Sequence, residues 1–478
     1  MEPSTVSEAG SQVKVIFTTT DESIQLPDSK RQLLVPAELG RHGLTMLLNS
    51  EAMLHTPSTL SFDFLVNGAY LRTSLDKYLK DNGLSFETNL TLQYVRSVLP
   101  PRHAGTLEHD DWVSAVDVLS ETSPAGLWAG SSFGGQDRIL SASYDGLLRI
   151  WNTSSQLMAT SPAVSAERYA SSLKAAKFLS ESKIASTGMD RTVRVWKYTE
   201  HDRESGEIKP TLELYGHTGS VDALAVDGNS KRLLTASTDG SIGFWATTKD
   251  SAPEVDKALL PGASGSKRRK ISSAVSAAQR GPLSMMRHHN SPATAVIFDP
   301  KDRTIGYSAS QDHTLHTIDL TTSRVVSTVR KSNALFSLAA IPRASAPLLA
   351  VGTAERVIYL IDPRESTTTT SVMTLVGHKN LVSTLAAAPD NDYSLLSGSH
   401  DGTVKIWDLR DVRPARVKDG GVAGSVSEPV VTIKRDVEPK KMAIPGDGCK
   451  IFSVVWDQKL GIVSGSEDKK VQIDSYMA

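Results

Sequence analysis

Residues 397–407, with the sequence SGSHDGTVKIW, contain the pattern that decides the fold of this chain. A run of small residues leads to an acidic residue, Asp401, and a tryptophan follows it at position 407. The pair Asp401-Gly402 tolerates the positive φ that a tight β-hairpin turn requires. The stretch therefore predicts two adjacent antiparallel strands, with Trp407 near the end of the second strand.

The same pattern recurs along the chain. Three further stretches keep both the acid and the tryptophan, namely residues 141–151, 186–196 and 235–245. Three degenerate stretches keep the acid but have lost the tryptophan, namely residues 308–318, 351–361 and 464–474. Most intervals between successive acids are close to the roughly 40–45-residue period of a WD-repeat blade. The array resembles the WD-repeat family over about residues 102–478, which implies a mainly β fold, a seven-bladed β-propeller.

The polar residues around these turns are predicted to be structural. In the WD-repeat family the turn acid, an upstream histidine, a Ser or Thr of the second strand and the tryptophan belong to one hydrogen-bonded set of four within a blade. By resemblance, two such tetrads are expected where a Gly-His pair lies upstream: His217, Asp239 and Trp245, and His378, Asp401 and Trp407. A catalytic triad is not favoured, because the set recurs and no Gly-x-Ser-x-Gly elbow accompanies it. The sequence has no P-loop, cofactor fingerprint or metal-ligand cluster, so we expect no enzyme and no metal or cofactor of its own.

The seventh copy of the pattern lies near the end of the chain, so its blade lacks a fourth strand. Because an unpaired sheet edge invites aggregation, another part of the chain is expected to pair there. Residues 102–109, just before the first blade, are the predicted donor.

Residues 12–99 do not follow the repeat and are predicted to form a small α+β domain. We expect a hairpin from residues 12–19 and 23–27, a helix over 41–51, a strand-turn-strand over 61–72, a helical turn over 74–83 and a strand over 90–98. This order is that of ubiquitin-like (β-grasp) domains, and residues 1–11 are expected to be a flexible N-terminus. The chain continues through Pro100-Pro101 into the propeller instead of ending in a free Gly-Gly tail. The domain is therefore predicted to dock on a partner, not to be conjugated to one.

The composition narrows the classes of partner. Lys and Arg number 52 and Asp and Glu 53, so a net charge of −1 provides no general attraction to nucleic acid, and direct RNA contact stays open. No apolar run is long enough to predict a membrane-spanning helix. The single cysteine, Cys449, cannot form an internal disulfide, which suits a reducing compartment.

Two long intervals in the repeat are predicted to hold disordered insertions, at about residues 246–290 and 411–445. The first is rich in Ala, Ser, Gly and Pro, a composition that buries too little apolar surface to order. It carries a basic cluster that is either a nuclear-import signal or an ordinary solvated charge run. The cluster consists of Lys267, Arg268, Arg269 and Lys270.

Several stretches together point to one family. They are SFDFLVNGAYLRTSLDKYL from residue 61, GLSFE from residue 83, HDDWVSAV from residue 109, YSASQDHT from residue 307 and GHKNLVSTL from residue 377. Over essentially the whole chain the sequence resembles the nucleolar ribosome-biogenesis WD-repeat proteins of the Ytm type, with a Notchless-like, ubiquitin-like N-terminal domain. The resemblance implies a non-enzymatic scaffold for pre-rRNA processing and pre-60S maturation, located in the nucleus (nucleolus and nucleoplasm).

The resemblance also implies partners and their sites. The propeller is expected to bind the block-of-proliferation protein, itself a propeller protein, and through that complex pescadillo. The ubiquitin-like domain is expected to dock on the AAA+ ATPase midasin, whose adhesion-type site holds magnesium and whose ATP-driven pulling releases the factor. In the family the acid of the Gly-Leu-Ser-x-Glu motif completes that metal site, which by resemblance is Glu87, with Asp76 and Asp81 as fallback donors. The same resemblance favours nuclear import as the role of the basic cluster.

A second hypothesis treats the chain as a substrate receptor of a cullin-type ubiquitin ligase. Residues 407–410 read Trp-Asp-Leu-Arg, which matches the Trp-Asp-x-Arg box of such receptors. The match is weak, because Trp-Asp is common at the end of any WD-repeat blade.

Overall fold

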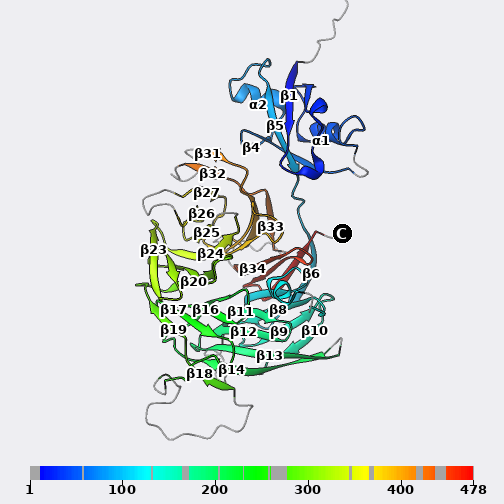
Figure 1. Ribbon diagram of the computed structural model, residues 1–478. Helices are drawn as coiled ribbons and strands as arrows, with labels where there is room; N and C mark the ends of the chain where they lie inside the picture. The colour runs from blue at the N-terminus through cyan, green and yellow to red at the C-terminus, as the bar shows by residue number, and fades with distance from the viewer. Residues whose placement is uncertain are drawn as a thin grey trace, which may run out of the picture. The chain divides into compact units, whose positions relative to one another are not determined.

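The computed structural model describes most of the chain as two compact units (Figure 1). The first unit comprises Met1–Leu99 with Leu409–Pro414, and the second comprises Pro100–Asp408 with Ala415–Ala478. The described residues are 11–55, 59–130, 133–163, 172–202, 205–229, 231–256, 259, 277–343, 347–364, 371–415, 424–435 and 448–476. Residues 1–10, which belong to the terminus expected to be flexible, lie outside them.

The first unit has the β-grasp topology that the sequence predicts. Its sheet has the strand order β2-β1-β5-β3-β4, and β1 and β5 run parallel to each other. The strands are β1 (Gln12–Thr18), β2 (Gln32–Pro36), β3 (Phe62–Val66), β4 (Ala69–Tyr70) and β5 (Leu90–Arg96). The helices are α1 (Arg41–Asn49) and α2 (Leu75–Asp81), with short 3-10 turns at Glu22–Ile24 and Asp28–Lys30.

The prediction of a strand at residues 23–27 is wrong. These residues do not pair with β1, and the hairpin partner of β1 is β2, further along the chain. Ile24 and Leu26 do point into the core, as their spacing suggested. Their backbone, however, is bound to a side chain: Tyr94 Oη donates to Ile24 O at 2.6 Å and accepts from Leu26 N at 3.1 Å. The buried tyrosine thus satisfies the polar groups that a strand would have paired with β1.

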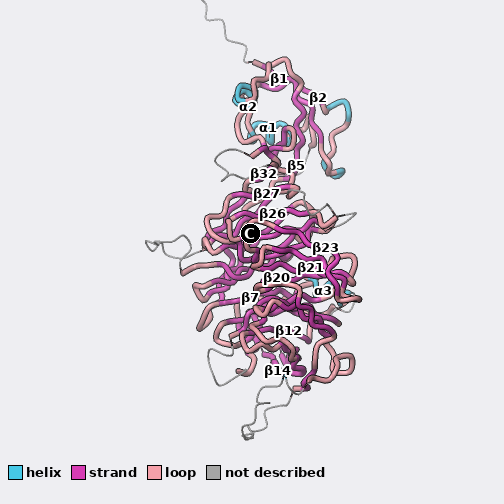
Figure 2. Tube along the Cα trace, turned by 90° about the vertical axis from the view of Figure 1, so that its left-hand side faces the viewer, coloured by secondary structure: helices cyan, strands magenta, loops and turns pink. Residues whose placement is uncertain are grey.

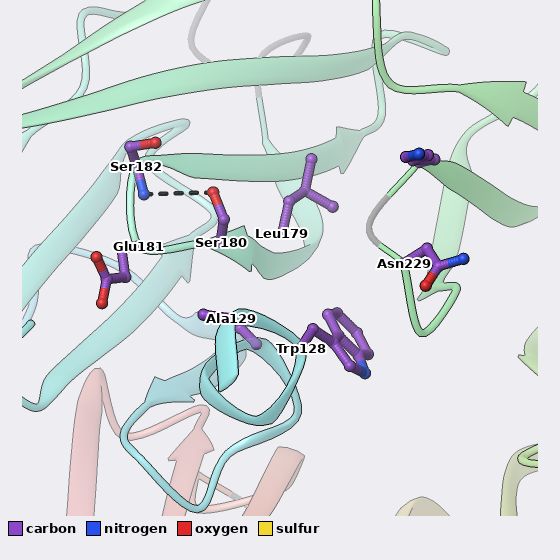
Figure 3. A pocket seen from close by; sticks show the side chains of 9 residues that line it. Trp128, Ala129, Leu179, Ser180, Glu181, Ser182 and Asn229 are labelled. Atoms are coloured by element: carbon purple, nitrogen blue, oxygen red, sulfur yellow. Dashed lines mark hydrogen bonds between the residues drawn. The ribbon is translucent and has the colours of Figure 1, made fainter. Parts of the chain in front are cut away.

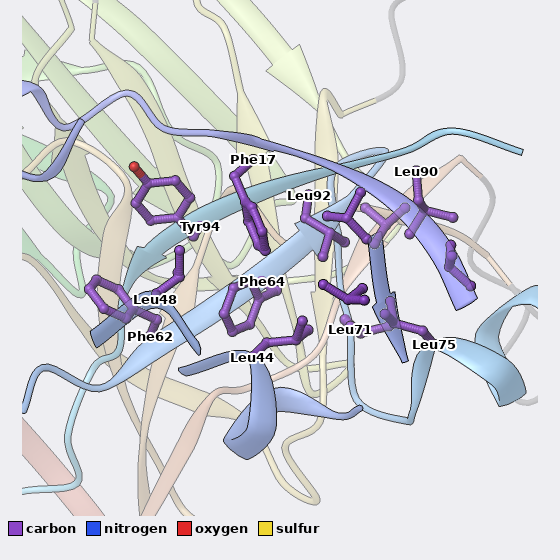
Figure 4. Close-up of a cluster of buried hydrophobic side chains, with 14 of the residues drawn as sticks. Phe17, Leu44, Leu48, Phe62, Phe64, Leu71, Leu75, Leu90, Leu92 and Tyr94 are labelled. Atoms are coloured by element: carbon purple, nitrogen blue, oxygen red, sulfur yellow. The ribbon is translucent and has the colours of Figure 1, made fainter. Parts of the chain in front are cut away.

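Aromatic rings form the centre of this small core (Figure 4). Tyr94 meets Phe17 and Phe62 edge-on, with ring centroids 6.2 and 5.8 Å apart. Leu44 of α1 and Leu75 of α2 are both fully buried against the same cluster. The alternation of apolar residues in β1 and β5 therefore places one face of the sheet against both helices.

The second unit consists almost entirely of strands (Figure 2), arranged in seven sheets over the described residues. Blade one contains β7 (Val113–Leu119), β8 (Arg138–Ser143), β9 (Leu148–Asn152) and β10 (Leu157–Thr160). Blade two contains β11 (Leu173–Ser180), β12 (Lys183–Gly188), β13 (Val193–Asp202) and β14 (Ser205–Leu214). Blade three contains β15 (Val221–Val226), β16 (Arg232–Ser237), β17 (Ser241–Ala246) and β19 (Ser284–Arg287). Blade four contains β20 (Ala293–Phe298), β21 (Ile305–Ser310), β22 (Thr314–Asp319) and β23 (Arg324–Arg330).

The remaining blades complete the array. Blade five contains β24 (Leu335–Ile341), β25 (Leu348–Thr353), β26 (Val357–Ile361) and β27 (Met373–Val376). Blade six contains β28 (Val382–Ala387), β29 (Ser394–Ser399), β30 (Thr403–Asp408) and β33 (Val431–Lys434). Blade seven contains β34 (Ile451–Asp457), β35 (Gly461–Ser466), β36 (Lys470–Ser475) and β6 (Arg102–Glu108). A short helix, α3 (Pro124–Ala129), lies in the connection between β7 and β8.

The seven blades close into a ring. The first strand of each blade contacts the first strand of the next, and β34 of blade seven contacts β7 of blade one. The closing strand is the predicted one, because β6 pairs antiparallel with β36 from Lys470↔Glu108 to Ser475↔Arg102. The chain before the first blade therefore covers the edge that the last blade would otherwise expose.

The small residues before each turn acid are explained by how closely neighbouring blades approach. A Cβ added to Gly398 of β29 would lie 2.7 Å from Ile451 of the next blade, and one added to Gly465 would lie 2.8 Å from Val113. Both strands are buried along their whole length. The Ser-Gly-Ser runs thus record face-to-face packing of sheets, which leaves no room for larger side chains.

Both insertions are shorter than predicted. The fourth strand of blade three, β19, lies within residues 246–290, and that of blade six, β33, lies within residues 411–445. Each segment also contains a short strand that pairs in parallel with the fourth strand of the preceding blade. β18 (Ala278–Arg280) pairs with β14 of blade two, and β32 (Ser425–Ser427) pairs with β27 of blade five. Composition averaged over a long segment concealed these strands, because each is ordered by the backbone of an existing sheet edge.

The second predicted insertion also contributes to the first unit. Its segment Leu409–Pro414 is grouped with that unit and ends in the short strand β31 (Arg413–Pro414). There Asp411 accepts hydrogen bonds from Tyr70 N at 3.0 Å and from Arg72 Nη2 at 2.9 Å. This part of the insertion is therefore held by specific contacts.

Candidate docking site

The loop that carries Glu87 joins α2 to β5 and is held at both ends. Gly83, with a φ of +64°, ends α2, and Leu84 N donates back to the last turn of the helix at 2.9 Å. Beyond it, Thr88 N donates to Ser85 O at 3.1 Å, and Glu87 N donates to Ser85 Oγ at 3.3 Å. The loop is therefore a defined turn, placed by its own hydrogen bonds.

Two buried leucines fix this turn to the core. Leu75 begins α2 and Leu90 begins β5, and both point into the apolar cluster (Figure 4). The turn between them is confined by a rigid helix on one side and the central strand pair on the other. The backbone of this turn consequently has a well-defined position.

The Glu87 side chain is exposed and available. No hydrogen bond or ion pair within the described part of the chain engages its carboxylate. Leu84 and Phe86 beside it are 38% and 36% exposed. The fallback donor Asp76 is less free, since Lys80 Nζ lies 2.8 Å from its carboxylate, whereas Asp81 is exposed at the end of α2. A magnesium site that lacks one oxygen ligand can accept such an unengaged carboxylate.

The predicted tetrads lie within their blades. In blade six, His378 Nδ1 is 2.9 Å from Asp401 Oδ2 and His378 Nε2 is 2.7 Å from Ser397 Oγ. Trp407 Nε1 donates to the same serine oxygen at 2.8 Å. The structure thus brings His378, Asp401 and Trp407 together through Ser397, and all four side chains are buried inside one sheet.

Blade three repeats this arrangement with a small variation. Trp245 Nε1 donates to Thr235 Oγ1 at 2.8 Å, and His217 Nε2 lies 2.7 Å from that oxygen. His217 Nδ1 bonds to Ser241 Oγ at 2.9 Å, while Asp239 Oδ2 is 3.6 Å away. Asp239 instead accepts from the backbone N–H of residue 218 at 2.7 Å, so it holds the turn before the blade.

The electrostatics of the tetrads suit a structural role. Burial alone would raise the pKa of the Asp401 carboxyl, but hydrogen bonds from His378, Lys379 N and Thr403 outweigh it and lower that pKa. Burial lowers the pKa of His378, so its imidazole is neutral near pH 7. The ionised Asp401 carboxylate therefore holds together the turn that supplies Lys379 N and Thr403.

The sequence did not predict two further tetrad histidines. In blade one, His109 Nε2 lies 2.7 Å from Ser141 Oγ, and in blade four, His289 Nε2 lies 2.8 Å from Ser308 Oγ. Neither histidine follows a glycine, so the Gly-His signal missed both. Spacing was an available signal for His289, which precedes Asp312 by 23 residues, as His378 precedes Asp401.

Blade seven uses an arginine in the same place. Arg435 Nη2 is 2.8 Å from Asp468, and Arg435 Nη1 donates to Ser464 Oγ at 2.8 Å. Its guanidinium also donates to Lys470 O at 2.7 Å. The planar donor fork therefore replaces the imidazole and bridges the turn acid to the second strand.

Most of the ligase-receptor box is buried. Trp407 and Asp408 are fully buried, and Leu409 is nearly so, which leaves Arg410 as the partly exposed residue of the box. The basic cluster at residues 267–270 lies outside the described residues.

A hollow of about 460 Å³ opens beside α3 (Figure 3). Trp128 and Ala129 of the helix face Leu179 and the hairpin turn at the end of β11. The Glu181 carboxylate at its edge is already engaged, because it accepts from the backbone N–H groups of residues 134 and 135 at 3.0 Å each. Nothing in its lining points to a particular ligand.

The described residues contain no group of three or more His, Cys, Asp or Glu side chains placed to hold a metal ion. Their helices include none of the length and apolar character needed to cross a membrane.

Two family models match the chain. The NLE (NUC135) domain matches residues 13–79. The WD domain, G-beta repeat, matches residues 102–152, 208–246 and 369–408. The matches fall on the β-grasp unit and on the propeller.

Curated relatives match over nearly the whole length. Ribosome biogenesis protein ytm1 of Neurospora crassa is 66% identical, covering 98% of each chain. Ribosome biogenesis protein YTM1 of Chaetomium globosum is 63% identical over 99% of each chain, and that of Chaetomium thermophilum is 62% identical over 97% of this chain and 95% of the relative. Among solved structures, the WD40 beta propeller domain of Doa1 matches with a TM-score of 0.52 at 18% identity, covering 78% of this chain and 97% of that one. This last likeness concerns the fold alone.

Proposed function

Because this chain belongs to the Ytm1 family of ribosome biogenesis proteins, we propose that it is a non-enzymatic scaffold in the maturation of the large ribosomal subunit. In this role it joins pre-60S particles in the nucleolus and nucleoplasm and supports pre-rRNA processing. The propeller binds the block-of-proliferation propeller protein, and pescadillo joins through that complex. The polar sets of the propeller support a scaffold, since they are buried and bound to one another.

In this proposal the N-terminal unit is the part of the chain that midasin binds in order to remove the factor from the particle. It docks on the adhesion-type metal site of midasin, where Glu87 supplies the last oxygen ligand to the partner's magnesium. ATP-driven pulling by midasin then removes the factor from the particle. The observation that supports this role is the unengaged Glu87 carboxylate on a turn held at both ends.

The test is binding of the full chain to the isolated metal-binding domain of midasin in magnesium buffer. Glu87→Ala should abolish binding, because magnesium loses an oxygen ligand at a position that demands near-ideal octahedral geometry. Glu87→Asp should weaken it sharply, since the shorter side chain misplaces the oxygen. A chelator should abolish binding of the unaltered chain.

Matched controls separate the metal ligand from general surface charge. Glu51→Ala removes another exposed carboxylate of the same unit and should leave the affinity unchanged. If Glu87→Ala binds as tightly as the unaltered chain, the assignment is overturned. If only Asp81→Ala loses binding to the metal-binding domain, Asp81 is the metal ligand in place of Glu87.

A further inference from the structure

An aromatic cluster lies on the propeller outside the tetrads. Trp112 is 5.5 Å from Tyr144 and 6.0 Å from Phe452, measured between ring centroids, and Tyr144 and Phe452 are 6.2 Å apart. His400 meets Phe452 edge-on at 5.6 Å. Trp112 is 39% exposed, so the cluster reaches the surface.

The fold gathers these side chains from three blades. Trp112 directly precedes β7 and Tyr144 directly follows β8 in blade one. His400 directly follows β29 in blade six, and Phe452 is the second residue of β34 in blade seven. The start of a first strand and the end of the antiparallel second strand lie at the same end of a sheet. All four residues therefore face one rim of the ring.

The cluster is held in place before any partner arrives. Tyr144 N donates to Trp112 O at 2.9 Å, and Trp112 N donates to Asp111 Oδ1 at 2.8 Å. Lys174 Nζ donates to Tyr144 Oη at 2.8 Å and sits 4.7 Å from the centre of the tyrosine ring. Pre-organised aromatic side chains lose little conformational entropy on binding, which is why they dominate the energetics of interfaces.

Charge around the cluster indicates the chemistry of the partner. In the described part of the chain, no carboxylate forms an ion pair with Lys174. Lys450 is paired with Glu467 at 3.2 Å, and Lys469 donates to Asp110 O at 2.9 Å. Beside Trp112, Asp110 is paired with Arg149 at 2.9 Å and Asp111 accepts from Trp112 N at 2.8 Å, so neither acid neutralises Lys174. A lysine without a paired carboxylate beside exposed aromatic rings fits a protein surface that offers a carboxylate next to an apolar side chain.

We propose that the surface formed by Trp112, Tyr144, His400, Phe452 and Lys174 docks a partner protein. The partner surface places an apolar side chain against Trp112 and Phe452 and a carboxylate against Lys174. This inference rests on the proposed function, in which the propeller carries the protein partner of the scaffold.

The experiment measures the affinity of the full chain for the purified propeller of the block-of-proliferation protein. Trp112→Ala should weaken binding by about tenfold or more, as truncation of a central aromatic anchor does. Lys174→Glu should weaken it to a similar extent, because it opposes two carboxylates. Leu127→Ala is the matched control: this side chain is 66% exposed in the connection at the other end of blade one, and its loss should leave the affinity unchanged.

The outcomes distinguish the two proposals. If the unaltered chain does not bind this partner, the proposed function of the propeller fails, and this inference fails with it. If the unaltered chain binds and both Trp112→Ala and Lys174→Glu bind equally well, only the docking surface is overturned. A Trp112→Ala effect on a single-stranded RNA probe, without an effect on the protein partner, would also overturn it. Thermal unfolding of each variant checks the fold, and Lys174→Glu keeps the test valid should Trp112→Ala prove unstable.

Discussion

Two carboxylates, one in each unit, show how differently the two parts of this protein use acidic residues. Asp401 in the propeller is buried and accepts hydrogen bonds from His378, Lys379 N and Thr403. Glu87 in the β-grasp unit is exposed, and its carboxylate is unengaged by any described residue. The first kind of acid recurs around the ring, whereas the second belongs to a single turn of the β-grasp unit. The repeated acids stabilise the architecture, and the docking role is proposed for an exposed, unengaged carboxylate.

The comparison predicts opposite consequences for substitutions in the two classes. Changes to the repeated, buried sets should lower the stability of the propeller, because their partners would be left unsatisfied. Changes to exposed groups should leave stability intact and remove a partner, as expected for Glu87→Ala.

The largest effect is expected for Trp407→Ala. The truncation of a fully buried aromatic costs about 3–5 kcal/mol, and Ser397 loses a hydrogen-bond donor as well. Urea unfolding of the propeller measures the change, with Leu127→Ala, whose side chain is 66% exposed, as the control. If the Trp407→Ala protein is as stable as the unaltered chain but has lost one partner, the structural role assigned to the buried sets is wrong.

Removal of residues 1–99 separates the two units. The shortened chain should still join pre-60S particles through its propeller but should fail to leave them, since the unit proposed to bind midasin is absent. The rate at which the factor leaves purified particles on addition of ATP is the measurement. A second deletion that also removes β6 (Arg102–Glu108) should destabilise the propeller, because blade seven loses its closing strand. Normal release of the first deletion variant would contradict the division of roles.

The buried histidines predict a loss of stability in mild acid. Burial, reinforced by the Arg149 guanidinium, lowers the pKa of His109 from 6.5 to about 4, and burial, reinforced by the neighbouring His316, lowers that of His289 to about 4. The unfolded chain therefore takes up protons first, so their contribution to stability is complete above about pH 6.5 and is lost as the pH falls toward 4. Each histidine adds at most about 1.4 kcal/mol per pH unit to this slope. Urea midpoints at pH 7 and pH 5 should differ less in His289→Gln, whereas an unchanged slope would argue against a buried neutral imidazole.

The smallest effect on the folded protein is expected from the basic cluster. Replacing Lys267, Arg268, Arg269 and Lys270 with glutamine should shift the protein from nucleus to cytoplasm without changing its unfolding temperature, because none of the described strands of the blades contains them. Fluorescence microscopy of the tagged protein, in cells depleted of its partners, measures the distribution. Undiminished nuclear accumulation would assign these residues to ordinary solvated charge.

Local pattern in the sequence was sufficient for the architecture. The Asp-Gly turns, the small residues before them and the tryptophan after them act within one hairpin. Each copy of the pattern therefore specifies its own pair of strands and the turn between them. Seven copies therefore predicted the blades, the missing strand of the last blade and its donor before Val113. The exposed position of Glu87 also followed locally, from the end of α2 at Gly83 and the start of β5 at Leu90.

Only the tertiary structure decided which distant segments pair. Residues 23–27 have a strand-like pattern, yet Tyr94 takes their backbone hydrogen bonds and β2 replaces them beside β1. The short strands within both insertions are ordered by the edges they cover, and Arg435 joins blade seven from the end of blade six. The aromatic cluster likewise exists only because ring closure brings blade one beside blades six and seven. Such choices depend on packing between parts of the chain that are far apart in sequence, and no local pattern encodes them.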